Sequence, residues 1–394
     1  MADQDVLMQQ YPMIDDLIPV AHRRVPRYAI DYLEHGAGRE RLVRKNRSAF
    51  DDVRITPRYL RTLDGLDPSV DLFGQRYDLP FGIAPVGMGS LIWPGAEMIN
   101  GKAAAENNIP MTLSTVACTS MEAMAEVTEG RLWYQLYSPK DEAIRWDLVR
   151  RAKAAGIDVL MVTVDVPVPP RRERTIRSGL SVVPKITIGN VVRAALRPTW
   201  SLETLRHGIP QFRNFAPYIP PGSSFQDAAN FVRDQLGRPI GLDEVKAIRD
   251  RWSGKLIVKG ILHPDDAVAT VDDVGADGVL VSNHGGRGSD AAPPSIDALP
   301  AIVDAVGKRA TILLDSGIRS GLDVLRACSL GADFVLVGRP FFYGVAALGK
   351  PGAHHVIRIL RDELGHAMRQ HGCDSLAFRS SDVTAGCCPA KAHQ

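Results

Sequence analysis

The chain has 394 residues, of which 45% are hydrophobic and 23% charged, and its formal net charge is +2. This composition is typical of a soluble globular protein. Because Lys and Arg are mostly interleaved with acidic residues, no basic stripe of the kind that binds nucleic acid is predicted. No apolar stretch approaches the roughly 20 residues that a membrane-spanning helix needs.

Cysteine usage and the polar N-terminus indicate the compartment. The five cysteines, with neither disulfide nor metal-ligand spacing, are Cys118, Cys328, Cys373, Cys387 and Cys388. An odd number fits a reducing cytosol better than secretion, and residues 3–5 are polar where a signal peptide would be basic and apolar. We expect no metal site, and a protein that is cytoplasmic or attached to a membrane only peripherally.

The predicted elements begin with a helical preface over residues 1 to about 75. Eight short β-rich runs follow, at 81–85, 111–114, 132–137, 159–164, 256–259, 278–282, 311–315 and 334–337. Several are nearly continuous in apolar residues, as strands buried on both faces should be. Helical patterns lie between them, for example at 121–126, 143–154, 264–270 and 321–330.

Eight alternating units predict an α/β fold, a closed (β/α)8 TIM barrel. An open doubly wound sheet is the competing architecture, but it more often has fewer strands. We predict a single domain over residues 1–394, with the barrel core at about 76–350.

An insertion is predicted at about 177–250, because about ninety residues separate the fourth run from the fifth. Loops that follow barrel strands line the active-site mouth, so the insertion should face it. Its segment 188–215 combines apolar residues and Trp200 with arginines and few acids. This pattern suits an interfacial membrane segment, and it suits equally a lid or an oligomer contact.

Polar residues and glycines recur at the predicted C-terminal ends of the strands, where barrel enzymes place catalysis. They are Ser114, Gln135, Tyr137, Thr163, Asp165, Lys259, Ser282, His284, Arg287, Asp315, Arg319, Gly338 and Arg339. A packing requirement would not place polar groups at the same end of nearly every strand, so their shared position predicts an active site.

Two of these loops predict a phosphate site. Residues 315–321 and 338–340 follow the seventh and eighth runs and supply glycines and two arginines. Glycines let backbone N–H groups approach a ligand, and arginines make charge-assisted contacts with phosphate. No Gly-x-Gly-x-x-Gly element follows a first strand, so NAD is not indicated.

His284 lies between a strand end and a glycine pair, and its reference pKa near 6.5 suits base catalysis. Asp165 could orient it and stabilise its protonated form. Arg172 and Arg287 are guanidinium groups matched to a carboxylate. The run 171–174 could equally be a solvated charge cluster.

At these motifs the chain resembles the FMN-dependent 2-hydroxy acid oxidase and dehydrogenase family, which includes glycolate oxidase, flavin-type lactate dehydrogenases and mandelate dehydrogenase. The likeness spans about residues 10–385 and is carried by the motifs at 135–137, 163–165, 258–260, 282–287 and 315–319. The resemblance implies a barrel, the cofactor FMN and a homotetramer.

The resemblance also implies site roles. His284 would be the base, oriented by Asp165. Arg172 and Arg287 would hold the substrate carboxylate, with hydrogen bonds from Tyr32 and Tyr137, and Lys259 would stabilise negative charge on the flavin. The residues that would hold FMN are Pro85, Val86, Gly87, Ser114, Gln135, Thr163, Lys259, Ser282, Asp315, Ser316, Gly317, Arg319, Gly338 and Arg339.

Several positions depart from the family pattern. Ser316 replaces a commoner glycine, Gly288 and Ser289 stand where Gln-Leu is frequent, and Val116 replaces the Trp of several oxidases. Gly87 stands where oxygen-using members tend to have Ala. Together with the insertion, Gly87 favours a quinone-linked dehydrogenase over an oxygen-using oxidase.

The sequence therefore predicts oxidation of an (S)-2-hydroxy acid, lactate-like or mandelate-like, to the 2-oxo acid by bound FMN, with a quinone as electron acceptor. The alternative acceptor is oxygen, which would yield hydrogen peroxide. Two hypotheses of other classes are a non-redox FMN isomerase and a non-catalytic protein that binds a phosphate-bearing ligand.

Overall fold

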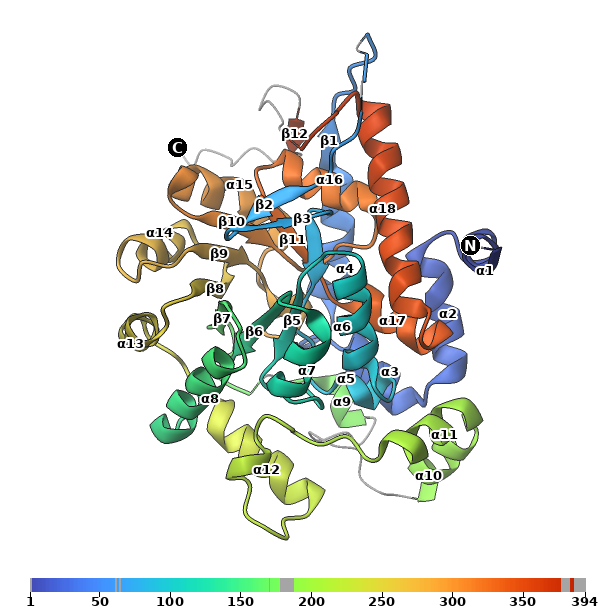
Figure 1. The fold of residues 1–394 in the computed structure, drawn as a ribbon, viewed down its shortest axis with the longest axis vertical. Coiled ribbons are helices and arrows are strands. Elements are labelled where there is room, and N and C mark those ends of the chain that lie inside the picture. The colour runs from blue at the N-terminus through green and yellow to red at the C-terminus, as the bar shows by residue number, and fades with distance from the viewer. Residues whose placement is uncertain are drawn as a thin grey trace.

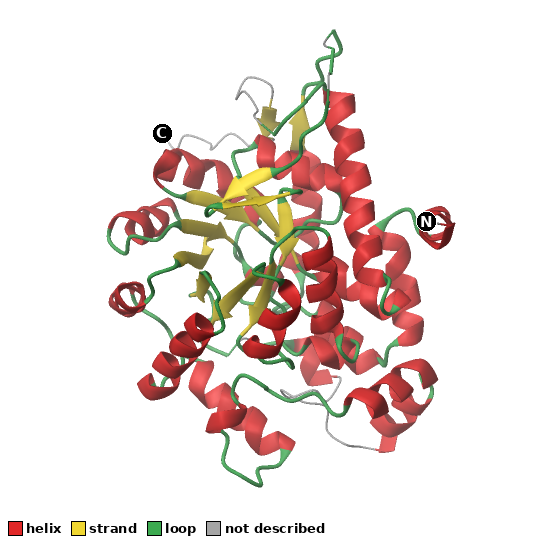
Figure 2. Cartoon of the chain, in the orientation of Figure 1, coloured by secondary structure: helices red, strands yellow, loops and turns green. Residues whose placement is uncertain are grey.

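The computed structural model describes residues 2–60, 62–63, 65–169, 171–177, 188–376 and 383–385. Parallel strands close a barrel in the order β4, β5, β6, β7, β8, β9, β10 and β11, and β11 pairs back onto β4 (Figures 1 and 2). Their bounds are β4 Phe81–Ile83, β5 Met111–Ser114, β6 Leu132–Leu136, β7 Val159–Thr163, β8 Lys255–Ile261, β9 Gly278–Val281, β10 Thr311–Leu314 and β11 Phe334–Val337. All eight predicted runs are confirmed as barrel strands.

The barrel interior is apolar at its N-terminal end and polar at its C-terminal end. Trp133, Met161, Ile257, Leu280 and Leu313 point inward and form one buried cluster. Side chains of a strand return to the same face every second residue. The next inward positions along these strands are therefore Gln135, Thr163, Lys259, Ser282 and Asp315, so the strand period carries the predicted polar residues to the mouth.

The N-terminal end of the barrel is closed by a short hairpin of β2 Val70–Leu72 and β3 Gln75–Tyr77. Tyr77 and Phe73 pack against Trp133 in edge-to-face contacts, and Phe334 joins them. The indole Nε1 of Trp133 donates to the Tyr77 hydroxyl over 3.3 Å. This aromatic cluster leaves the opposite mouth as the open end.

Helices cover the outside of the barrel (Figure 2). Their bounds are α5 Gly89–Ile92, α6 Ala96–Glu106, α7 Met121–Thr128, α8 Glu142–Ala154, α13 Leu242–Arg251, α14 Pro264–Asp272, α15 Ser295–Val306, α16 Gly321–Ser329, α17 Arg339–Leu348 and α18 Gly352–His371. The helices predicted at 121–126, 143–154, 264–270 and 321–330 are confirmed. Short turns η3 His284–Gly286 and η4 Gly307–Arg309 complete these connections.

The N-terminal preface contains α1 Ala2–Gln10, α2 Ile14–Arg24, α3 Arg27–Glu34, α4 Arg41–Ser48 and η1 Ala49–Asp52. After these helices, β1 Val53–Ile55 pairs with β12 Val383–Ala385, from the other end of the described chain. Helix α2 packs along α17, α3 packs against α5 and α9, and α4 packs against η3. The preface thus lies across the C-terminal mouth of the barrel.

The insertion between β7 and β8 contains α9 Glu173–Arg177, α10 Ile188–Ala195, α11 Pro198–His207, η2 Ala216–Tyr218 and α12 Phe225–Leu236, ahead of α13. Residues 178–187 of the predicted insertion lie outside the described residues. Trp200 of α11 is buried, and its Nε1 donates to the carbonyl of Ile92 over 3.0 Å. No helix of the described ranges is long and apolar enough to cross a membrane.

Candidate active site

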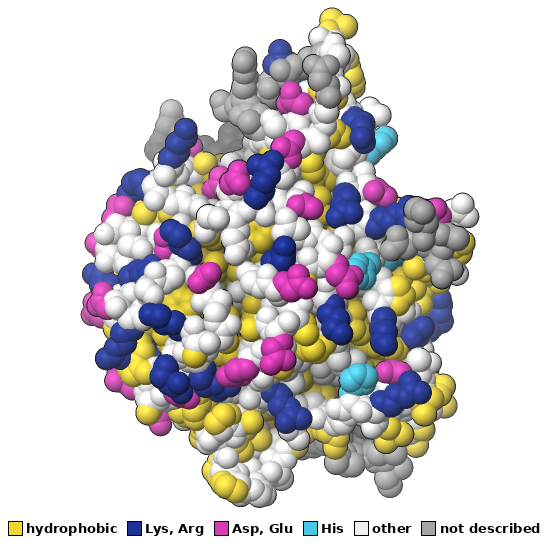
Figure 3. Space-filling view, viewed as in Figure 1, with side chains coloured by type: hydrophobic (Ala, Val, Ile, Leu, Met, Phe, Trp, Pro, Cys, Tyr) yellow, Lys and Arg dark blue, Asp and Glu magenta, His cyan; other side chains and the backbone are white. Residues whose placement is uncertain are grey.

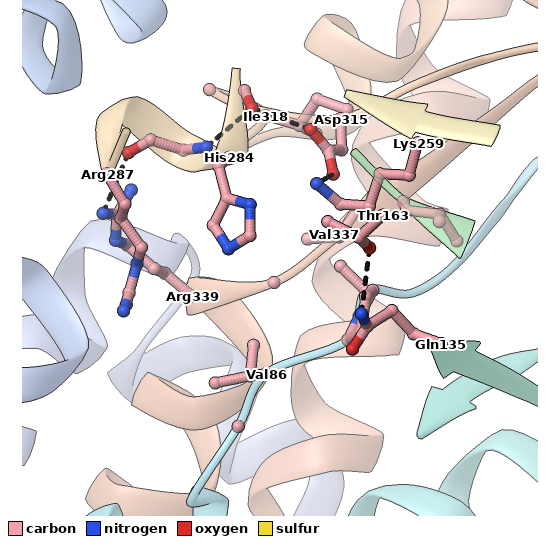
Figure 4. Close-up of a pocket in the computed structure, with 18 of the residues that line it drawn as sticks. Val86, Gln135, Thr163, Lys259, His284, Arg287, Asp315, Ile318, Val337 and Arg339 are labelled. Carbon is pink, nitrogen blue, oxygen red and sulfur yellow. Dashed lines mark hydrogen bonds and ion pairs between the residues drawn. The ribbon is translucent and has the colours of Figure 1, made fainter. Parts of the chain in front are cut away.

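A cavity lies at the C-terminal mouth of the barrel, and most of the predicted site residues line it (Figure 4). These are Tyr32, Pro85, Val86, Gly87, Gln135, Tyr137, Thr163, Arg172, Lys259, His284, Arg287, Asp315, Ser316, Gly317, Arg319, Gly338 and Arg339. Ser114, Asp165 and Ser282 do not line it, but each hydrogen-bonds to a residue that does. The structure therefore brings the predicted residues together.

Several apolar wall positions were not predicted from the sequence, namely Ala84, Ile318, Leu336 and Val337. Three of them belong to β4 or β11 or follow directly at the strand end, so strand position alone could have indicated them. The buried histidine His35, which contacts Arg287, was also missed. No local pattern marks it, because its partner is 252 residues away in the chain.

His284 has both ring nitrogens engaged. Its Nδ1 lies 2.8 Å from the Asp165 carboxylate, and its Nε2 lies 3.0 Å from the Tyr137 hydroxyl. Burial would raise the pKa of Asp165, but Lys259 and His284, which is protonated at the low pH where Asp165 titrates, outweigh burial and hold that pKa at about 2. The ionised carboxylate accepts the Nδ1 proton, which leaves Nε2 as the nitrogen with a free lone pair.

The electrostatic surroundings keep His284 uncharged. Burial lowers the pKa of His284, and the attraction of Asp165 offsets only part of this effect. Burial also raises the pKa of Tyr137, so its hydroxyl keeps its proton and donates to Nε2. A neutral histidine with an accepting nitrogen directed into the cavity can act as a general base.

The loop that carries His284 takes a conformation that few residues adopt. His284 has φ 58° in the left-handed region, where histidine is tolerated better than branched residues. Its backbone N–H donates to Ser282 Oγ over 3.1 Å. Opposite it, Gly260 has φ 106°, and a Cβ there would lie 2.4 Å from that of Asp165. Glycine at 260 therefore lets Asp165 approach the base.

Lys259 provides a buried cation below the mouth. Its Nζ lies 2.8 Å from Ser282 Oγ, 3.4 Å from Asp165 and 3.6 Å from Asp315. Burial would lower the pKa of Lys259, but the two carboxylates outweigh it and raise that pKa. The lysine is 4% exposed and stays charged.

A polar row runs beside Lys259 around the barrel. The Gln135 amide donates to Thr163 Oγ1 over 2.9 Å and accepts from Ser114 Oγ over 3.0 Å. These two contacts fix which way the amide oxygen and nitrogen of Gln135 point. Figure 4 shows Gln135, Thr163 and Lys259 on one side of His284, with Arg287 and Arg339 on the other.

Two half-buried arginines lie beside His284, with no acidic partner among the described residues. In the part of the chain that the structure describes, no ion pair joins Arg172 or Arg287 to a carboxylate, and the buried Nε of Arg172 has no hydrogen-bond partner. Burial, followed by repulsion from Arg172, lowers the pKa of Arg287 to about 10. Unpaired buried cations are costly, and a bound anion would relieve that cost.

The neighbouring arginines show how the run 171–174 divides. Arg171 is exposed, whereas Arg172 faces the cavity. Arg174 bonds to Glu40 and Glu34, each over 2.9 Å, and so ties α9 to the preface. The run was predicted either to bind a carboxylate or to be a solvated charge cluster. Arg172 is placed for the first role, and the exposed Arg171 fits the second.

A second pair of arginines lies at the other end of the cavity, with no carboxylate partner among the described residues. Arg319 donates to the carbonyl of Ile318, and within these residues its buried Nε has no partner. The described acceptors of Arg339 are backbone carbonyls, among them those of Leu33 and Gly285 at 3.0 Å each. Burial lowers the pKa of both guanidinium groups to about 10. These donors match the predicted phosphate site.

The loop after β10 shapes this end of the cavity. Gly317 has φ 115°, and a Cβ there would lie 2.0 Å from the carbonyl oxygen of Asn46, so only glycine fits. Ser316 also has positive φ, at 76°. Its hydroxyl donates to Asp315 over 2.7 Å and accepts from the Gly285 N–H over 2.9 Å. These bonds compensate for the serine at a position where glycine is commoner.

The loop beyond Arg287 is held by the preface. Asp290 accepts hydrogen bonds from the backbone N–H groups of Arg39 and Leu42, over 3.0 and 2.9 Å. It thereby caps the start of α4 with a carboxylate from the loop after β9. The unusual residues Gly288 and Ser289 thus belong to a loop whose end is fixed on the preface.

Comparison with known proteins agrees with this geometry. A family model described as FMN-dependent dehydrogenase matches residues 21–385. An L-lactate dehydrogenase of Caulobacter vibrioides strain NA1000 / CB15N is 39% identical over 371 residues, covering 94% of this chain and 96% of that protein. An L-lactate dehydrogenase of Ectopseudomonas mendocina is 38% identical, covering 93% and 97%.

Two kinds of solved structure are similar. The monotopic membrane protein (S)-mandelate dehydrogenase has a TM-score of 0.90 and 33% identity, covering 96% of this chain and 100% of its own. A mandelate oxidase has a TM-score of 0.79 and 36% identity, covering 93% and 96%. The chain belongs to the FMN-dependent dehydrogenase family, and it is an oxidoreductase whose cofactor is FMN.

The residues of the cavity fit that cofactor. A phosphate dianion needs cationic donors, and Arg319 and Arg339 have no carboxylate among the described residues that would compete for them. A flavin ring system needs polar partners along one edge and apolar walls. Lys259 and Gln135 supply the former, and Val86, Leu336 and other apolar side chains supply the latter.

Proposed function

We propose that the protein oxidises an (S)-2-hydroxy acid, lactate-like or mandelate-like, to the corresponding 2-oxo acid. Oxidation of 2-hydroxy acids agrees with the names of its relatives, which act on L-lactate and on (S)-mandelate. The observation that carries the proposal is the pair of half-buried arginines, with no carboxylate partner among the described residues, beside the neutral His284. A carboxylate next to a hydroxyl group matches this arrangement.

In this proposal, Arg172 and Arg287 bind the substrate carboxylate and thereby fix the α-carbon. Guanidinium groups bind carboxylates through paired N–H donors. Tyr32 and Tyr137 both line the cavity and offer hydroxyl groups to the substrate. Burial raises the pKa of each, so both hydroxyls stay protonated.

His284 takes the proton of the substrate hydroxyl at Nε2. Asp165 then stabilises the resulting imidazolium through the 2.8 Å contact at Nδ1. The α-hydrogen leaves with its bonding electron pair, and FMN, when bound, supplies the acceptor for this hydride. Lys259, charged and lining the cavity, would stabilise the negative charge that the cofactor gains.

We also propose which residues hold FMN. Arg319 and Arg339, with the loops 315–319 and 338–339, bind the phosphate and ribityl end. Lys259, Gln135 and Thr163 bind the polar edge of the ring, with Ser114 and Ser282 fixing their orientation. The backbone of Pro85, Val86 and Gly87 forms one wall.

Anaerobic mixing of the purified holoenzyme with a panel of 2-hydroxy acids tests the reaction. (S)-Lactate or (S)-mandelate should bleach the flavin absorbance, and the R enantiomers should not. An FMN isomerase predicts no net reduction by any hydroxy acid, and that result would overturn the proposal.

Arg172→Leu should raise KM at least 10-fold, because a charge-assisted contact to the carboxylate is lost.

For the electron acceptor, we propose a quinone rather than oxygen. Gly87 and the amphipathic insertion support this choice. The two are close in the structure, because Trp200 of α11 hydrogen-bonds to Ile92 at the end of α5, and α5 follows the loop that contains Gly87. Reoxidation of the reduced enzyme should be much faster with a soluble quinone than with air-saturated buffer. Faster reoxidation by oxygen, with release of hydrogen peroxide, would favour an oxidase instead.

The pH dependence of turnover should report His284. Only the unprotonated ring can accept the substrate proton, so turnover is expected to fall as pH falls through the pKa of His284, which lies below the ordinary value of 6.5. Asp165→Asn removes the charge that raises this pKa. The acid limb of kcat/KM should therefore move to lower pH, and kcat should fall by about 10²-fold or more. An acid limb that stays in place would contradict the assignment of Asp165.

We propose peripheral membrane attachment through α10 and α11. Several apolar side chains in α11 or next to these helices are exposed, including Leu196, Leu202, Leu205 and Ile209. Arginines lie among them, and Figure 3 shows basic and hydrophobic side chains together at the lower right edge, where Figure 1 places these helices. The similar (S)-mandelate dehydrogenase is described as a monotopic membrane protein. Amphipathic helices with arginines bind anionic bilayer surfaces.

Sedimentation with anionic phospholipid vesicles tests this attachment. Leu202→Ser combined with Leu205→Ser should lower the bound fraction several-fold, because Leu205 is 81% exposed and its burial in the bilayer is lost. Leu60→Ser is the control, since Leu60 is 101% exposed but lies outside the insertion. Equal binding of both variants and wild type would contradict attachment through these helices.

We propose further that residues 1–394 form one domain and that the enzyme is a homotetramer. The preface supports the first point, because α2, α3 and α4 pack on α17, α5 and η3 of the barrel. Light scattering of the purified protein would measure its mass in solution. The mass of a monomer would contradict the homotetramer.

A further inference from the structure

His35 directly follows α3 and is fully buried, at 0% exposure. Its Nε2 lies 3.2 Å from Nη1 of Arg287, and its Nδ1 lies 3.2 Å from the carbonyl oxygen of Asp31. Its ring stands edge-on to that of Tyr32, with centroids 5.6 Å apart. The histidine therefore touches two of the residues assigned to the substrate.

These contacts fix the protonation state of the ring. A guanidinium group has only N–H donors, so Nε2 must be the acceptor in the contact with Arg287. The carbonyl of Asp31 can only accept, so Nδ1 carries the proton. His35 is consequently neutral, with one defined tautomer.

The groups that face His35 favour this neutral form. Arg287 approaches from the loop after β9, Arg172 from the start of α9 and Arg339 from α17. From α3 come Tyr32 and the Asp31 carbonyl, while the Asp31 carboxylate lies near Arg27 and Arg174. Burial first, and then the three arginines, lower the pKa of His35 well below 6.5.

Every acceptor that bonds to Arg287 in the described part of the chain is uncharged. Besides His35, the carbonyls of Leu33 and Tyr32 accept from its Nη2 over 2.7 and 3.3 Å. These three hydrogen bonds orient the group, and they leave two of its five N–H donors for a ligand. Arg174, by contrast, bonds to the carboxylates of Glu34 and Glu40, which neutralise it. Arg287 is held in place and keeps its full charge for a ligand.

We propose that His35 is a positioning residue for substrate binding. Its neutral imidazole orients Arg287 toward the substrate carboxylate without cancelling the charge of that arginine. This inference rests on the proposed function, because it takes the ligand of Arg287 to be a carboxylate.

Three substitutions separate the features of the imidazole. His35→Gln keeps an uncharged acceptor near the position of Nε2. His35→Phe keeps a ring of similar size but removes the acceptor. His35→Glu introduces a carboxylate that can pair with Arg287. The FMN content and the melting temperature of each holoenzyme show whether the fold and the cofactor site are intact.

The measurement is the dissociation constant of oxalate, an unreactive small carboxylate, from the holoenzyme, followed by the change in flavin absorbance. His35→Gln should bind within about threefold of wild type. His35→Phe should bind about 10- to 100-fold more weakly, the range expected for a hydrogen bond to a charged group. His35→Glu should bind at least as weakly as His35→Phe, since the clamp loses its charge. Equal affinities for His35→Gln and His35→Phe would overturn the inference.

The tautomer provides a readout that does not depend on ligand binding. In a ¹⁵N-histidine NMR spectrum at pH 6.5, the resonances that disappear in His35→Gln should be those of a neutral ring protonated at Nδ1. A charged ring would overturn the inference.

The outcomes also distinguish this inference from the proposed function. If wild type binds oxalate and the variants behave as expected, but no hydroxy acid bleaches the flavin, the reaction is wrong and the role of His35 stands. If turnover is as proposed but the variants bind oxalate alike, His35 has no positioning role. If wild type does not bind oxalate, the carboxylate clamp itself is wrong.

Discussion

Replacing His284 with glutamine is expected to leave FMN bound while hydroxy acids no longer reduce it at a useful rate. Glutamine has a similar length but cannot accept a proton at the position of Nε2, which lies 3.0 Å from the Tyr137 hydroxyl. Loss of a general base typically costs 10²- to 10⁴-fold in rate. Anaerobic stopped-flow reduction of the flavin measures this loss directly.

Tyr137→Phe is the matched control for that experiment. It removes the hydroxyl that contacts Nε2 but leaves the base and its contact with Asp165 in place. Its reduction rate should fall less than that of His284→Gln. Reduction by His284→Gln at the wild-type rate would show that another group accepts the proton.

Replacing Lys259 with methionine is expected to lower the free energy of unfolding more than the other substitutions considered above. The substitution removes the cation that lies 3.4 Å from Asp165 and 3.6 Å from Asp315. Breaking a buried pair by removing one partner typically costs about 3–5 kcal/mol in the free energy of unfolding, because the remaining charge stays buried. Urea denaturation at pH 7 would measure this loss, and FMN content should fall with it.

The pH dependence of that loss follows from the Asp165 carboxylate. In wild type, the depressed pKa of Asp165 contributes stability above the unfolded value of 3.8, and this contribution is lost only as pH falls toward about 2. Without Lys259, burial of Asp165 is opposed by one charge fewer, so the pKa of that carboxyl rises and it can protonate in mild acid. The loss in the free energy of unfolding caused by Lys259→Met should therefore be smaller at pH 5 than at pH 7.

Lys255→Met provides the control on the same strand. Lys255 begins β8, is half-exposed and pairs with Asp277 over 2.9 Å. Exposed ion pairs contribute about 0–1 kcal/mol, so this variant should unfold close to wild type. Equal losses of unfolding free energy in Lys259→Met and Lys255→Met would contradict the view that burial makes Lys259 important for stability.

The barrel and its mouth could be predicted from the sequence because both depend on short-range patterns. Strands buried on both faces are continuously apolar, and the side-chain period of two places Gln135, Thr163 and Lys259 inward, each two residues after a buried side chain. The resemblance then supplied expected roles for these positions. Neither signal requires knowledge of contacts between distant parts of the chain.

Contacts across long sequence separations could not be predicted. His35 meets Arg287 from 252 residues away, and Asp290 caps α4 from 248 residues away. The different roles of the three arginines in the run 171–174 could not be predicted either, because these arginines have similar neighbours in the sequence. Their different roles arise only where Glu34 and Glu40 of the preface approach α9.

The preface makes the active site depend on both ends of the chain. Tyr32 and His35 belong to the first tenth of the sequence, and the carbonyls of Leu33 and His35 accept hydrogen bonds from Arg339, at the start of the helix after the last barrel strand. During synthesis α3 leaves the ribosome long before Arg339 exists. A chain that stops short of β11 therefore lacks the Arg339 contacts that help to hold the turn after Tyr32. Such truncated products should be catalytically inert even if their first strands pair, so activity reports that the whole barrel has been made.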